Sequence, residues 1–160
     1  MTPEQLSALK AYILSQPDLA PISSGPGTDY AQIAALLNAN ASPVTLAWMT
    51  AVPANGSDDA PDYSTYDALA AGKRDSWGLF LRRDTRDFTR NKVRKWITDV
   101  WGNATANSNA EAILLAGTEK ASRAEVAFGG NTKTTGTVSA LDRAWQGEIS
   151  ITDVNQAMAS

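Results

Sequence analysis

The strongest folding signal in the sequence is a helical stripe of large apolar residues in the stretch RNKVRKWITDVWG. Five residues recur at the spacing i, i+3, i+4, i+7, i+8, which places them on one face of an α-helix. They are Val93, Trp96, Ile97, Val100 and Trp101. Gly102 follows directly and is the expected stop of the helix. An apolar stripe of this kind needs a partner surface, so the chain has to build a core around it.

Apolar spacing and capping residues predict further helices. Thr2 caps a helix over residues 3–15, with Pro3 at its first position and Gln5 three residues after the cap. Asp29 caps another helix, which ends near the stretch NANASP. The other predicted helices cover residues 63–83, residues 109–128 and a short segment after Ser150 or Thr152.

Strand patterns are short. The stretch VTLAWMTAVP reads as extended, and residues 145–151 alternate between apolar or small and polar positions. We expect TVSAL to pair with the second segment as a hairpin. The predicted fold class is therefore mainly α, with about five helices and a short β-hairpin or strand near the C-terminus. We expect a single domain over residues 1–160, with flexible loops near 16–28, 53–62 and 129–136.

Basic residues are concentrated in one segment, which runs from Lys73 to Lys95 and is called the basic segment below. It holds nine of the fourteen basic residues and three aspartates, a net charge of +6 in a protein of net charge −3. Residues 1–72 have a net charge of −6, and residues 96–160 have −3. Such separation suits a molecule that meets copies of itself, or partners, with opposite faces. Internal pairing of the two halves is the alternative.

Three interpretations of the basic segment remain open. It is a solvated helical face, a docking surface for an acidic partner such as a neighbouring copy, or a phosphate contact with nucleic acid. The chain as a whole is acidic, and Trp96 belongs to the buried stripe. Both observations argue against a dedicated nucleic-acid-binding protein. Trp48 is either a core residue or an interface anchor. The candidate interaction residues are Arg82, Arg83, Arg86, Arg90, Lys92, Arg94, Lys95 and Trp48.

The chain contains no cysteine and no histidine. Disulfides, Cys/His zinc sites and histidine-based hydrolytic triads are thereby excluded, which leaves carboxylate, lysine or tyrosine chemistry. Asp58, Asp59 and Asp62 are close enough to chelate a hard cation, but their spacing misses the calcium-loop pattern. We expect no enzyme, no cofactor and no metal site. We also expect a soluble chain without a membrane partner, because neither a secretory signal nor an apolar stretch of roughly 18 residues is found.

Five stretches span nearly the whole chain, namely MTPEQLSALKAYI, ASPVTLAWMTAVP, VRKWITDVWG, KASRAEVAFGG and WQGEISITDVNQAM. In this order they resemble a group of small proteins from the structural module of tailed bacteriophages and prophages. Residues 55–90, which hold much of the basic segment, match least. The resemblance implies a non-enzymatic structural protein of the virion, assembled in the host cytoplasm.

A small, mainly helical subunit with separated charge is similar in kind to head-to-tail connector proteins, also called adaptor or neck proteins. By this analogy the chain forms a ring of identical copies between the portal and the tail. Its partners would be sister copies and the portal, tail or neck proteins, with passing contact to packaged DNA. The alternatives are a virion protein of the tail or capsid, or a small DNA-binding or regulatory phage protein that uses the basic segment.

Overall fold

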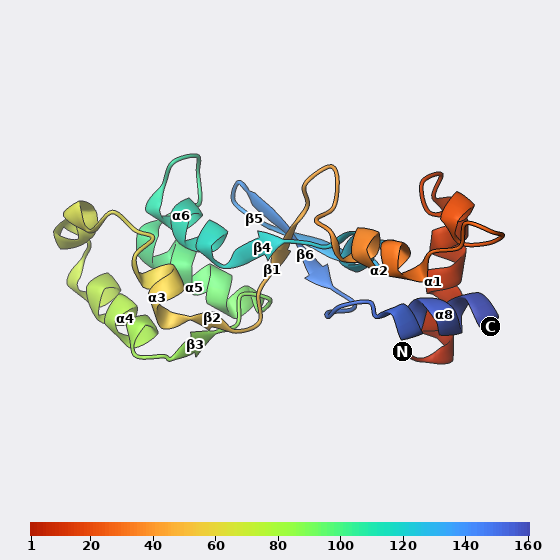
Figure 1. The fold of residues 1–160 in the computed structure, drawn as a ribbon. Helices are drawn as coiled ribbons and strands as arrows, with labels where there is room; N and C mark the ends of the chain where they lie inside the picture. Colours follow the sequence, from red (N-terminus) through yellow and green to blue (C-terminus); the bar gives the residue numbers. More distant parts are fainter. The chain divides into compact units, whose positions relative to one another are not determined.

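The chain folds into two compact units, each with its own hydrophobic core. The structure, a computed structural model, describes residues 1–160. Unit 1 comprises Met1–Thr45, Lys120–Asn131 and Arg143–Ser160, and unit 2 comprises Leu46–Glu119 and Thr132–Asp142. Each unit therefore combines segments that are distant in sequence (Figure 1). A single domain over the whole chain stays a prediction.

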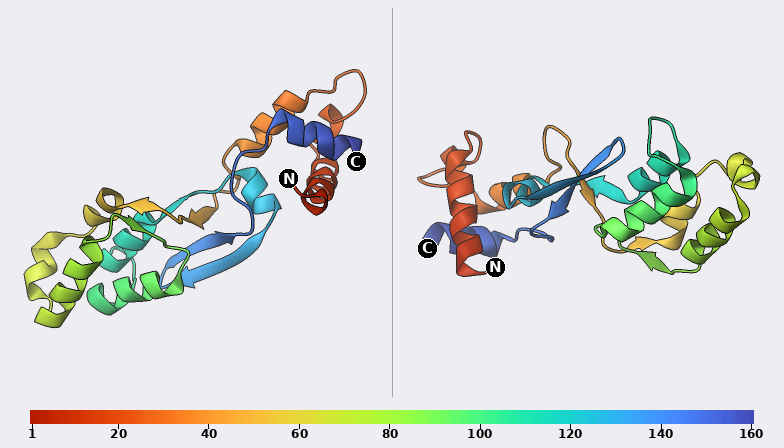
Figure 2. Two further views of the ribbon diagram at one scale, coloured as in Figure 1. Left: turned by 90° about the horizontal axis from the view of Figure 1, so that it is seen from below. Right: turned by 180° about the vertical axis from the view of Figure 1, so that it is seen from behind.

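Unit 1 is helical, and its helices α1 and α8 bring the two ends of the chain together (Figure 1; Figure 2). Leu9 and Ile13 of α1 and Val154 of α8 are buried in its core. The side chain of Asn38 bonds to both backbone groups of Ile149, at 2.9 and 2.8 Å, and so ties the end of α2 to the segment before α8. The elements are α1 (Pro3–Ser15), the 3-10 helix η1 (Ala20–Ile22), α2 (Tyr30–Asn38), α7 (Arg123–Ala127) and α8 (Ile151–Ala159).

An ion pair in unit 1 joins α7 to the loop after α1. Arg123 donates through Nη1 and Nη2 to the two carboxylate oxygens of Asp18, at 2.5 and 2.7 Å, and through Nε to the Tyr12 hydroxyl. Hydrogen bonding to Arg123 holds the pKa of the Asp18 carboxyl below its ordinary value. The same contact raises the pKa of Arg123. The pair therefore favours the ionised form of both groups in the folded state.

We expect Asp18→Asn to remove a contribution to stability that depends on pH. Because the folded pKa of Asp18 is depressed, the pair stabilises unit 1 above the unfolded pKa of about 3.9 and loses this effect as the pH falls through the folded pKa. Thermal denaturation of wild type and D18N should differ most near neutral pH and converge in strong acid. A difference that stays constant over this range would show that Asp18 acts through something other than its charge.

Unit 2 packs helices against a small mixed sheet. The strand order is β4-β1-β6-β5, and β1 runs parallel to β6 with Ala47 opposite Leu141. Strands β2 and β3 form a separate antiparallel pair. Trp48, Trp77 and Phe80 are among the fully buried side chains of the core. The elements are β1 (Leu46–Trp48), β2 (Val52–Pro53), α3 (Ala54–Asp58), the 3-10 helix η2 (Tyr63–Ala68), α4 (Ala71–Leu81), β3 (Thr85–Arg86), α5 (Asn91–Trp101), α6 (Asn109–Ala116), and most of β4 (Thr118–Lys120), β5 (Gly130–Thr135) and β6 (Val138–Arg143).

Helices with a clear cap in the sequence lie where they were predicted. A capping box at Thr2–Gln5 precedes α1, and the Asp29 side chain caps α2. Helix α5 ends at Gly102, which has a φ of 90° that glycine adopts without strain. Ser150 caps α8. None of the helices in the chain is both long and apolar enough to cross a lipid bilayer.

The predicted fold class was wrong. In place of about five helices and a hairpin near the C-terminus, the chain has eight α-helices and two 3-10 helices, and its strands begin at Leu46. Four of the strands form one mixed sheet. The parallel pairing of β1 with β6 joins distant parts of the chain, and local sequence patterns carry no information on such a pairing.

The helix predicted over residues 109–128 is interrupted by strand β4. Helix α6 ends at Gly117, where a Cβ atom would lie 1.9 Å from the Phe88 ring. A glycine is therefore needed here for the ring to pack. A second helix, α7, starts after Ser122, which forms a capping box with Glu125.

Two other predicted elements have different boundaries. The helix over 63–83 splits into η2 and α4, because the two residues between them are extended. No strand forms over 145–151; β6 pairs with β5, which fills most of the loop predicted at 129–136. Strand β5 is polar and almost wholly exposed, so no apolar alternation marks it. The loops predicted near 16–28 and 53–62 contain η1 and α3.

Candidate interaction site

The basic segment folds into unit 2 together with acidic residues from the preceding block of sequence. Unit 2 contains ten basic and eleven acidic residues, for a net charge of −1, and unit 1 has a net charge of −2. Arg86 pairs with Asp58, and Arg74 lies 3.8 Å from Asp67. Much of the charge separation seen along the sequence is therefore balanced inside one unit.

Arg86 lies in the interior of unit 2. Its side chain is 1% exposed, and its Nη1 is 2.7 Å from the Asp58 carboxylate. The guanidinium also donates to the carbonyls of Ala54 and Phe80 and to the Ser57 hydroxyl, while stacking on the Phe80 ring. These bonds join α3, α4 and β3. A buried cation that is bound on all sides holds the fold and is not accessible to a partner.

Arg94 and Trp48 are internal as well. Arg94 donates to two backbone carbonyls and to the Thr135 hydroxyl, and its guanidinium lies 4.8 Å from the centre of the Trp48 ring. Burial lowers the pKa of Arg94. Trp48 is fully buried. Its place in the core rules out a role as an exposed interface anchor.

The other five predicted interaction residues lie on the surface of unit 2. Arg82 and Arg83 follow α4, Arg90 directly precedes α5, and Lys92 belongs to the first turn of α5. Lys95 lies one turn further on and pairs with a neighbouring aspartate at 2.6 Å. Arg82, Arg83 and Lys92 form no ion pair. These three cations are therefore available to a partner.

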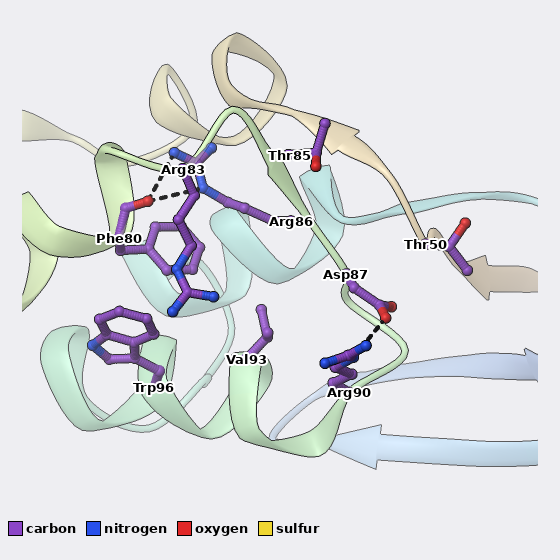
Figure 3. Close-up of a pocket in the computed structure, with 9 residues that line it drawn as sticks. All are labelled: Thr50, Phe80, Arg83, Thr85, Arg86, Asp87, Arg90, Val93 and Trp96. Atoms are coloured by element: carbon purple, nitrogen blue, oxygen red, sulfur yellow. Dashed lines mark hydrogen bonds and ion pairs between the residues drawn. The ribbon is translucent and has the colours of Figure 1, made fainter.

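Arg83 and Arg90 line a pocket of about 140 Å³ between the end of α4, strand β3 and the start of α5 (Figure 3). The apolar part of its lining comes from Phe80, Val93 and Trp96. Figure 3 shows the Arg83 guanidinium directed toward Trp96, at 5.1 Å from the ring centre. Trp96 belongs to the predicted apolar stripe. It is only partly buried, and its exposed part forms a wall of this pocket.

Helix α5 begins with charges of the unfavourable sign. Its N-cap is Arg90, whose side chain makes no capping hydrogen bond, and its first turn holds Lys92 and no acidic residue. The amide groups at a helix N-terminus carry partial positive charge, so nearby cations lower helix stability. Residues that are unfavourable for their own helix in this way are often found at functional sites.

We expect Lys92→Glu to raise the free energy of unfolding by about 0.3–1 kcal/mol at low salt, because it places a favourable charge at the start of α5. The matched variant Lys95→Glu should have the opposite effect, since it replaces the ion pair with Asp99 by a like-charge contact. Urea denaturation measures both. A loss of stability in K92E would show that Lys92 supports the fold.

The aspartates of residues 58–62 have separate structural roles. Asp58 pairs with Arg86, and the Asp62 side chain accepts a hydrogen bond from the Ser64 amide at the start of η2. That bond lowers the pKa of Asp62. No group of three or more acidic side chains is arranged to hold a metal ion.

No family model, curated protein or solved structure matches the chain. The function is therefore inferred from the residues of unit 2 and their geometry, together with the resemblance of the sequence.

Proposed function

We propose that this chain is a non-enzymatic structural protein of a tailed-phage particle, held there by contacts with other proteins. The observation that carries the proposal is the set of exposed, unpaired cations Arg82, Arg83 and Lys92 on the surface of unit 2, of which Arg83 lines the pocket. Lys92 opposes the stability of its own helix, and Arg83 faces a pocket with its donors unused. The five stretches that resemble phage structural-module proteins are the reason for proposing a phage particle.

Within the particle, we place the chain in the connector between portal and tail. Subunits of a closed ring contact each other head to tail, so each needs two different and complementary faces. The exposed cations of unit 2 would form one such face, against an acidic surface on a sister copy, the portal or a neck protein. The finished virion is then the final location, and the host cytoplasm is the place of synthesis.

A dedicated DNA-binding role fits the surface less well. Two aspartates, Asp84 and Asp87, lie among the exposed cations, and unit 2 as a whole is acidic. A protein that binds the DNA backbone needs clustered positive charge, and its affinity falls steeply between low and moderate salt. Passing contact with packaged DNA is compatible with the proposed connector.

The proposal is tested by quantitative mass spectrometry of purified particles, followed by a map of the particle neck. We expect several copies of the chain per particle and symmetric density that fits units 1 and 2 between portal and tail. Presence in the tail or capsid alone would contradict the connector assignment. Absence from the particle would overturn the whole proposal.

A further inference from the structure

Arg83 is held in one orientation while its hydrogen-bond donors stay unused. Its guanidinium lies over the Trp96 ring, and the Trp96 Nε1 donates to the Ser76 hydroxyl, which fixes the indole in turn. The Phe80 ring meets Trp96 edge-on, with ring centres 5.5 Å apart. The Arg83 side chain makes no hydrogen bond and no ion pair. An exposed arginine stacked in this way has already lost part of its rotamer freedom, so a ligand would bind it at a lower entropic cost.

The charge that faces the pocket is also unbalanced. Arg86 is neutralised by Asp58, and Arg90 is neutralised by Asp87, whose Oδ2 accepts from Arg90 Nε at 2.9 Å. Arg83 has no such partner. The hydroxyls of two lining threonines, Thr50 and Thr85, are likewise without hydrogen bonds. One net positive charge and two free hydroxyls therefore surround a small pocket with an apolar wall.

We propose that this pocket binds the carboxylate of a glutamate or aspartate side chain from an acidic segment of a partner protein. The planar fork of Arg83 matches a carboxylate in a bidentate hydrogen bond. The methylene groups of the acidic side chain would pack against Phe80, Val93 and Trp96. The inference takes from the proposed function only that the partner is a protein.

The size and surroundings of the pocket favour a protein carboxylate over a nucleic-acid phosphate. Its volume of 140 Å³ has room for one acidic side chain. A phosphate chain that passed over Arg83 would also meet Asp84 and Asp87. Asp87 also lines the pocket, but its carboxylate is paired with Arg90, so a single acidic side chain directed at Arg83 meets less repulsion than a chain of phosphates.

The test uses the full chain and four probes, namely the tripeptides acetyl-Glu-Glu-Glu-amide and acetyl-Gln-Gln-Gln-amide, a ten-nucleotide oligothymidylate and inorganic phosphate. Binding is followed through the NMR signals of the Arg83 Nε–H and Trp96 Nε1–H groups. The variants are Arg83→Gln and its neighbour Arg82→Gln, which removes the same charge from a side chain without a stacking partner.

We expect only the glutamate peptide to shift both signals saturably. R83Q should weaken its binding about tenfold or more, the effect of losing a charge-assisted hydrogen bond, while R82Q changes it by about twofold at most. Equal losses in R83Q and R82Q, equal binding of the glutamine peptide, or tighter binding of oligothymidylate or phosphate would each overturn the inference. If the chain binds the glutamate peptide but is absent from particles, the proposed function is refuted and the carboxylate site is supported. If the chain is present in particles but does not bind the peptide, only the carboxylate site is refuted.

Discussion

Replacing Arg86 with alanine should lower the free energy of unfolding of unit 2 by about 3–5 kcal/mol. The substitution leaves the Asp58 carboxylate, which is 26% exposed, without its cation. It also removes the hydrogen bonds that the guanidinium donates to Phe80, Ala54 and Ser57. Thermal denaturation should show a midpoint lower by roughly 10 °C or more.

Two controls separate the buried ion pair from a general effect of charge. Arg82→Ala removes the same charge from an exposed side chain without an ion pair and should change stability by about 0.5 kcal/mol or less. Asp58→Ala combined with Arg86→Ala should cost less than the sum of the two single changes, because the double variant leaves no buried unpaired charge. An R86A variant as stable as R82A would contradict the internal role of Arg86.

Replacing Trp48 with alanine should cost a similar amount, about 3–5 kcal/mol, because it leaves a large cavity in the core of unit 2. The Arg94 guanidinium also stacks on the Trp48 ring, and the Trp48 Nε1 donates to the Lys133 carbonyl at 3.2 Å. Trp48→Phe retains an aromatic ring and should cost less. Urea denaturation of both variants measures the difference.

Leu79→Ala is the matched control for Trp48. Leu79 is 55% exposed on α4, so its truncation should change stability by about 0.5 kcal/mol or less. If W48A unfolded no more easily than L79A, the side chain would not be part of the core. Trp48 would then again be a candidate interface anchor.

The parts of the fold that could be predicted are those that local chemistry decides. The capping groups at Thr2, Asp29 and Ser150 and the stripe of α5 mark helices in the sequence itself. The mixed sheet could not be predicted in this way. Strands β1 and β4 are three residues long, and β5 is polar, so their pairing depends on contacts with distant segments.

The candidate site was predicted as a charged segment, but not as two sets of arginines with different roles. The sequence contained no clear signal for the buried set, since Arg86 belongs to the two-residue strand β3 and the buried Phe88 lies in the turn that follows. Arg94 stands beside Val93 in the helical stripe, yet its burial depends on Trp48 and on the β5–β6 hairpin. Which arginine meets an aspartate from residues 58–67 is decided only by tertiary structure.

Charge counted along the sequence also overstated the charge that a partner meets. The net +6 of the basic segment is reduced to a few exposed cations once Arg86 and Arg94 are buried and Arg90 and Lys95 are paired. Arg74 lies 3.8 Å from Asp67, so Lys73, Arg82, Arg83 and Lys92 remain. The interaction proposed for unit 2 therefore depends on particular side chains and their positions rather than on a large electrostatic field.

The central claim is that the exposed cations dock the chain in a particle while the buried ones hold its fold. It is tested most directly by assembling particles with Arg83→Gln/Lys92→Gln in place of the wild-type chain and counting copies by quantitative mass spectrometry. The proposal predicts a melting temperature close to that of the wild type and a loss of most copies from the particle. Incorporation at the wild-type level by this stably folded variant would contradict it.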